Sequence, residues 1–163
     1  TSVTGAKFDI LRPGNHTLLH IPQHSLQEDA LVFVRAFVKH VGATCLDMYI
    51  ESLHITGKLV EERQRGGFSF FANQGGGVSK GWLSLGKLDL KVVYGTTVSG
   101  VRYLNMFARH LAKLGMPIGG ILGLDDHESA ATPEAGCQRR LALHSFPEED
   151  IEESGGRASW ASV

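Results

Sequence analysis

Apolar segments of roughly 6 to 11 residues, separated by glycines, run along most of the chain. Several of them alternate apolar and polar positions with a period of two, which is typical of strands with one buried face. The clearest cases are Asp47–Thr56, Leu83–Val93, which we expect to be one alternating strand, and the aromatic segment Phe68–Phe71. The 20 glycines of the chain mark turns between such segments. The pattern predicts an all-β fold of short strands and Gly-rich turns.

Two segments fit a helix as well as a strand. Ser25 and Glu28 have the spacing of a capping box, and apolar residues then follow at helical spacing. The stretch Val32–Val38 also alternates, and its β-branched and aromatic side chains favour a strand. The segment Val101–Leu114 carries both patterns, so periodicity alone leaves its state open.

The length of 163 residues fits a single domain with its own core. We expect a folded body over residues 1–144 and an acidic, extended tail over residues 145–163, which holds five acidic residues and one arginine. The body then has 15 basic and 12 acidic residues, a balance that does not favour nucleic-acid binding. No apolar run reaches the roughly 18 residues of a membrane-spanning helix, so no membrane span is expected. Trp160 is unusual in a polar tail, and we expect it to contact a partner chain.

Three histidines, His16, His20 and His24, are spaced by four residues. Pro13 and Pro22 argue against a helix through them. On a strand, positions four apart are separated by about 13 Å, whereas metal ligands must converge to about 2 Å from one ion. The spacing therefore argues against a metal site at these histidines.

The acidic loop Asp125–Glu128 follows a glycine-rich turn. Together with backbone carbonyls, Asp125 and Asp126 would supply the oxygen ligands that calcium prefers. Alternatively, the aspartates cap their own loop and have a structural role. Calcium is the one cofactor that the sequence indicates. The chain lacks the GxSxG, P-loop, HExxH and Rossmann motifs, so we do not expect an enzyme.

The two cysteines, Cys45 and Cys137, are too few for a zinc site of their own. A disulfide between them would close a loop of about 90 residues, while the alternative is two free thiols in a reducing compartment. The tripeptide that begins at Asn15 fits the N-glycosylation pattern and hints at secretory passage. The chain starts at Thr1 without the pattern of a signal peptide, and we expect any leader to be absent from it.

Two stretches carry a family resemblance. The first is Val41-Gly-Ala-Thr-Cys45, which leads into the strand-like segment Leu46–Ile50. The second runs from Gly119 to Cys137 and contains the pattern Gly-Gly-x-Leu-Gly-x-Asp-Asp-His. Together they resemble von Willebrand factor type D-like domains. The second stretch looks most like the C-terminal domain of inter-alpha-trypsin inhibitor heavy chains, and it is also similar to uncharacterised proteins of dinoflagellate algae. The resemblance covers Phe8 to about Leu143.

This resemblance implies an antiparallel β-sandwich in an oxidising, extracytoplasmic or luminal compartment such as the thylakoid lumen. It implies strands in both ambiguous segments and a Cys45–Cys137 disulfide. It also implies a non-catalytic structural or interaction module. The dinoflagellate similarity suggests an accessory subunit that binds protein subunits of a larger, membrane-associated and photosynthetic complex, such as a photosystem. The alternative hypothesis is a calcium- or carbohydrate-binding module that uses Asp125–Glu128.

Overall fold

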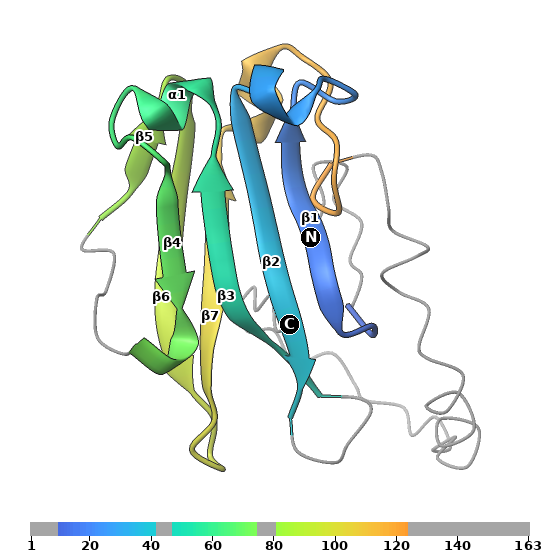
Figure 1. Cartoon of the computed structure of the whole chain (residues 1–163), viewed down its shortest axis with the longest axis vertical. Coiled ribbons are helices and arrows are strands. Elements are labelled where there is room, and N and C mark those ends of the chain that lie inside the picture. Colours follow the sequence, from blue (N-terminus) through green and yellow to red (C-terminus); the bar gives the residue numbers. More distant parts are fainter. Residues whose placement is uncertain (1–9, 42–46, 75–80, 124–163) are drawn as a thin grey trace, which may run out of the picture.

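The residues that the structure describes form an antiparallel β-sheet of seven strands (Figure 1). The structure is a computed structural model that describes residues 10–41, 47–74 and 81–123. The elements in chain order are β1 (Gly14–Ile21), η1 (Gln27–Asp29), β2 (Val32–His40), β3 (Met48–Thr56), α1 (Lys58–Glu61), β4 (Phe68–Phe71), η2 (Ala72–Gln74), β5 (Leu83–Leu85), β6 (Leu88–Thr96), β7 (Arg102–Arg109) and η3 (Leu111–Leu114). The predicted all-β, antiparallel class is confirmed in this part of the chain.

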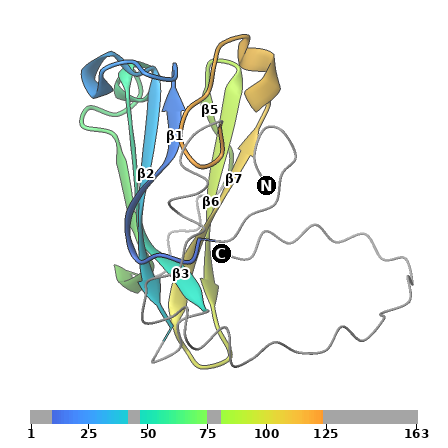
Figure 2. The same ribbon diagram turned by 90° about the vertical axis from the view of Figure 1, so that its right-hand side faces the viewer.

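The sheet follows the strand order β1-β2-β3-β7-β6-β5, and β4 pairs with β3 beside this path. The register between β3 and β7 consists of one pair, Ile50 with Leu104. Figure 2 shows the consequence of this narrow connection, because β1, β2 and β3 lie on one side of the molecule and β5, β6 and β7 on the other. We call β1–β4 the first layer and β5–β7 the second layer.

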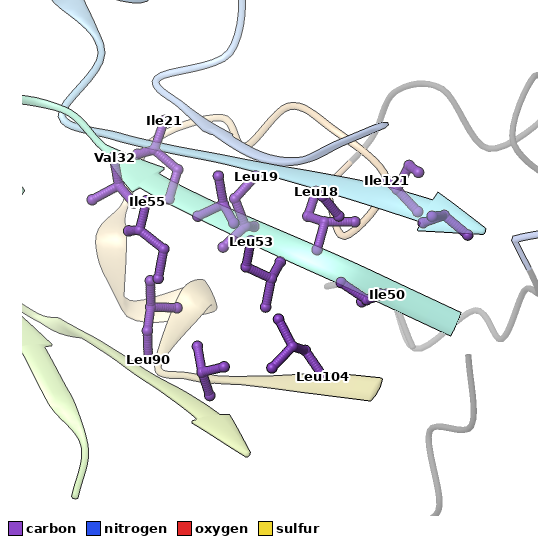
Figure 3. Close-up of a cluster of buried hydrophobic side chains, with 14 of the residues drawn as sticks. Leu18, Leu19, Ile21, Val32, Ile50, Leu53, Ile55, Leu90, Leu104 and Ile121 are labelled. Carbon is purple, nitrogen blue, oxygen red and sulfur yellow. The ribbon is translucent and has the colours of Figure 1, made fainter. Parts of the chain in front are cut away.

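The core lies between the two layers and is apolar (Figure 3). Both layers contribute fully buried side chains, because their strands turn one face of each pleat inward. The first layer supplies Leu19, Ile21, Val32, Val34, Val38, Leu53 and Ile55, and the second layer supplies Leu85, Leu88, Leu90 and Leu104. Burial of each such side chain contributes about 1.5–3 kcal/mol, so this seam is the main stabilising feature of the fold.

Two β-bulges interrupt the register of the first layer. Between β1 and β2 the pairing shifts after Thr17, which leaves Leu18 as the extra residue of β1. Between β2 and β3 it shifts next to Phe37, which leaves Glu51 as the extra residue of β3. A bulge exchanges the inward and outward positions of the residues that follow it. The alternation expected over Asp47–Thr56 therefore holds only before Glu51.

The second layer contains a hairpin where we expected one strand over Leu83–Val93, and that prediction is wrong. Gly86 has a φ of 63°, and β5 and β6 pair from Leu85↔Leu88 outward around the two-residue turn. Such left-handed glycines are typical of tight hairpin turns. The turn shifts the phase of the apolar alternation, because Leu85 and Leu88 are three residues apart and both buried. The expectation of one alternating strand overlooked this shift.

Both ambiguous segments contain strands, as expected. Val32 and Val34 point into the core from β2, and β7 covers most of Val101–Leu114 before η3 begins. The capping box, however, does not form. The short helix η1 has Leu26 at its N-cap and no side-chain cap, while the Ser25 hydroxyl donates to the Pro22 carbonyl at 2.9 Å.

The open edge of β1 is covered by the last described segment of the chain. His20 and Gly119 exchange backbone hydrogen bonds of 3.0 and 2.8 Å, and the Ile121 amide donates to the Thr17 carbonyl at 2.9 Å. Ile118 and Ile121 are buried there. Within the described ranges, no helix has the length and apolar character required to cross a membrane.

Candidate functional site

The site residues predicted from the sequence lie outside the described residues. These are Asp125 and Asp126 for calcium, Cys45 and Cys137 for the disulfide, and Trp160 for a partner contact. The acidic tail over residues 145–163 lies outside them as well. These assignments stay predictions, and the surfaces described below come from the structure alone.

The three evenly spaced histidines have different surroundings. The ring of His16 is 2.7 Å from the Arg12 carbonyl, His20 contacts Ser25, and His24 is exposed at a φ of 63°. Over residues 10–41, 47–74 and 81–123, no group of three or more His, Cys, Asp and Glu side chains could hold a metal ion.

The contact between His20 and Ser25 has the composition of a nucleophile and a base. The Ser25 Oγ is 3.1 Å from the His20 Nε2 and also donates its proton to the Pro22 carbonyl. A hydroxyl has one proton, so His20 must donate to Ser25 rather than accept from it. This polarity is opposite to the activation of a serine nucleophile, and the pair instead fixes the turn that follows β1.

The outward side of the first layer combines aromatic rings with cationic groups. We call it the aromatic face, and it consists of Phe33, Arg35, Phe37, Lys39, Tyr49, His54 and Phe71. These residues point outward because Val32, Val34, Ala36 and Val38, their neighbours on β2, fill the core. Figure 1 shows β2, β3 and β4 side by side in the first layer.

Contacts between neighbours hold the side chains of the aromatic face. Arg35 lies 5.8 Å from the ring centroid of Phe33, and Lys39 lies 5.6 Å from that of Phe37. His54 packs edge-on against Phe71 at 5.5 Å. Cations over aromatic rings provide modest attraction and also keep the rings partly covered. The result is a preformed surface with both apolar and cationic character.

The charge of the aromatic face is balanced at one end. The Lys39 ammonium donates to the Glu51 carboxylate at 2.7 Å. This hydrogen bond raises the pKa of Lys39 above its ordinary value, so the lysine is charged at neutral pH. Glu51 is the single carboxylate among the outward residues of the described strands β2, β3 and β4, which leaves Arg35 without an acidic neighbour on this face.

A groove of about 330 Å³ opens beside the aromatic face. It is lined by Tyr49 and Glu51 from β3, Asn73 from η2, Val101 from the turn before β7, and Arg102, the first residue of β7. The guanidinium of Arg102 donates to the backbone carbonyl of Asn73 at 3.3 Å and connects the two layers here. Sequence reasoning did not find this groove. Tyr49 and Glu51 do share a face in the alternation of their strand, but nothing in the sequence places Arg102 next to them.

The outward side of the second layer carries a smaller cluster around Trp82. The Arg109 guanidinium stacks 3.6 Å from the Trp82 ring centroid, and the Lys91 ammonium lies 6.0 Å from it. Phe107 pairs with Lys91 across the strands and is 42% exposed.

Comparison of the chain with family models, with curated proteins and with solved structures finds no match. The resemblance to von Willebrand factor type D-like domains therefore stays a prediction, and function must be argued from the surfaces.

Proposed function

We propose that the chain is a non-catalytic interaction module that binds a partner protein on the aromatic face. The observation that carries this proposal is the combination on one sheet face of Phe37, Tyr49 and Phe71 with Arg35 and Lys39. Phe33 is 8% exposed and supports Arg35 from below. Aromatic residues and arginine are enriched in protein interfaces, and a few of them usually dominate the binding energy.

The charge of the face indicates the chemistry of the partner. Arg35 is exposed and has no carboxylate beside it on this face, so an acidic side chain of a partner would pair with it. The partly buried ring of Phe37 would contribute apolar area next to that pair. The partner surface is therefore one with acidic groups around an apolar centre.

We further propose that the two layers form a β-sandwich of the von Willebrand D-like type. The apolar seam between the layers and the antiparallel pairing support this assignment. In that family context, the module is an accessory or assembly subunit in an oxidising, extracytoplasmic or luminal compartment. Its partners are protein subunits of a larger complex, which the dinoflagellate resemblance places at a photosynthetic membrane.

The test is capture of partners with the tagged full chain in non-reducing buffer, followed by mass spectrometry of the eluate. We expect one assembly to be recovered in stoichiometric amounts. The double variant Arg35→Glu with Phe37→Ala should lower its recovery at least about tenfold, because it removes an aromatic anchor and reverses the charge.

A matched control is Lys113→Glu, which makes the same charge change at an exposed position of η3 away from this face. Circular dichroism establishes that every variant is folded. Elution of the chain alone would contradict the proposal, and so would equal recovery by the double variant and the control.

A further inference from the structure

The groove next to the aromatic face is a product of the strand topology. β4 pairs with β3 over Ser52–Ile55, while β7 meets β3 only at Ile50. The two neighbours of β3 thus diverge where the bulge residue Glu51 lies, and η2 and the turn before β7 form the walls. The strand topology thus leaves a groove with a volume of about 330 Å³ between these elements. This size lies at the low end of the range of about 300–1,000 Å³ that is usual for small-molecule sites.

The lining of the groove contains one charged group of each sign, Glu51 and Arg102. Glu51 is held by Lys39 at 2.7 Å, and Arg102 is held by the carbonyl of Asn73 at 3.3 Å. An anionic ligand would meet the Glu51 carboxylate, and a cationic ligand would meet Arg102 and compete with Lys39. Desolvation next to a like charge weakens binding in either case. The groove therefore favours a ligand without net charge.

Donors and acceptors of the groove are arranged for groups that can both donate and accept. The Glu51 carboxylate uses Oε1 for Lys39, which leaves Oε2 as an acceptor. The Arg102 guanidinium has five N–H donors and uses one on the Asn73 backbone, so donors remain for a ligand, and Asn73 also lines the groove. One hydroxyl group can donate to Glu51 and accept from Arg102 at the same time. A peptide amide cannot do this with one atom.

The remaining walls suit a ring with an apolar face. Tyr49 contributes an aromatic side chain with a hydroxyl, and Ala72 and Val101 contribute small apolar surface. Aromatic side chains with a polar end bind ligands that are apolar on one side and polar at the rim. A pyranose has C–H groups on its faces and hydroxyls around its edge, and it fulfils both conditions.

From these observations we propose that the groove binds a neutral sugar, as a free monosaccharide or as the terminal unit of a glycan. Glu51, Arg102 and Asn73 hold its hydroxyls, and Tyr49 contacts its ring. The site shares Tyr49 with the aromatic face, but Glu51, Asn73 and Arg102 are not among the residues that define that face. It also differs from the acidic loop Asp125–Glu128.

The test is saturation-transfer NMR on the full chain with the methyl glycosides of glucose, galactose and mannose. We expect at least one of them to show saturation transfer. Asn73→Ala and Arg102→Gln should each weaken binding at least about fivefold, since each removes a hydrogen bond to the sugar. Tyr49→Phe should weaken binding less than Tyr49→Ala, because the ring is retained.

The charge argument is tested with a matched series in which galactose is compared with galacturonate and galactosamine. The neutral sugar should bind more tightly than either charged relative. A disaccharide glycoside that ends in the same sugar separates the two sources, because equal affinity identifies a terminal unit as sufficient and lower affinity identifies the free monosaccharide as the ligand.

Arg65→Gln and Gln64→Ala are the control variants, because both residues are exposed in the turn before β4, at the opposite end of that strand from η2. Absence of saturation transfer from all three neutral glycosides would overturn the proposal. So would tighter binding of a charged sugar, or binding that Asn73→Ala and Arg102→Gln leave at the control value. Loss of partner capture by the Arg35 and Phe37 double variant with unchanged sugar binding would show that the two functions are independent.

Discussion

The two layers share one core, but their strands maintain register differently. The first layer has an extra residue in two of its strands, Leu18 in β1 and Glu51 in β3. In the second layer, β6 and β7 pair from Asp89↔Arg109 to Thr96↔Arg102 without a shift. The groove lies next to one of the bulges, whereas the regular layer presents the smaller Trp82 cluster. The groove thus forms where the irregular strand β3 meets the start of the regular strand β7.

The largest expected effect comes from a shift of register in β3 away from the bulge. Deletion of His54 makes Leu53 and Ile55 adjacent, so these two fully buried side chains can no longer both point into the core. Turning one of them toward solvent costs at least about 1.5–3 kcal/mol, a large share of a usual stability of about 5–15 kcal/mol. We expect a clearly lower midpoint of thermal unfolding, followed by circular dichroism.

The control is deletion of Glu51, the extra residue of the bulge, which closes the bulge and leaves Leu53 and Ile55 at inward positions. It removes the ion pair with Lys39, which is partly exposed and should cost less than about 1 kcal/mol. If the two deletion variants unfold at the same temperature, the bulge does not determine which residues of β3 are buried.

A medium effect on stability is expected from glycine substitutions, because a Cβ meets different obstacles at Gly57 and at Gly95. Gly57 has a φ of 118°, and a Cβ there would lie 2.5 Å from the backbone oxygen of Leu31, which cannot move without displacing β2. Gly95 has an ordinary φ, and a Cβ would meet the ring of Tyr103, which can rotate. We expect Gly57→Ala to lower the free energy of unfolding by about 1–3 kcal/mol. Gly95→Ala should lower it by less. Urea unfolding measures both values.

Gly81→Ala is the matched control, because a Cβ at that position meets nothing within 4 Å. A Gly95→Ala variant that is less stable than Gly57→Ala would mean that the regular layer, and not the bulged one, has the tighter backbone constraint.

The smallest effect compares the cation–aromatic pairs of the two layers. Arg109 stacks on Trp82 at 3.6 Å, while Lys39 lies 5.6 Å from Phe37, near the distance limit for such contacts. Double-mutant cycles with alanine should give a coupling of about 0.5–1 kcal/mol for the first pair and a smaller one for the second. A larger coupling for Lys39 with Phe37 would reverse this order and would assign the stronger attraction to the aromatic face.

Local patterns predicted those strands that follow a simple period. Val32, Val34 and Val38 are buried at the alternating positions of β2, a strand of this layer that carries no extra residue. The same rule fails after Glu51, because the identity of a bulge residue is not encoded in apolar periodicity. The hairpin at Gly86 does change the phase of the alternation between Leu85 and Leu88, a signal that the prediction of one strand overlooked.

The candidate site was not accessible to sequence reasoning, because it depends on tertiary contacts. Glu51 lies at the groove because the strand pairing shifts there. Arg102, at the start of β7, lies about 50 residues later in the chain. The motifs that predicted a calcium site and a disulfide, Asp125–Glu128 and the two cysteines, lie outside the described residues. Motif reasoning and structural reasoning therefore point to different places in this protein.

The covering of β1 by the segment around Gly119 also determines the order in which the molecule can be completed during synthesis. The Thr17 carbonyl and the Ile121 amide form their hydrogen bond across about 100 residues of chain, a contact of very long range. On the ribosome, β1 emerges first and keeps an open edge until this late segment follows. A nascent chain of this protein therefore exposes an aggregation-prone edge for most of its translation, and a product that ends before Pro117 retains it permanently.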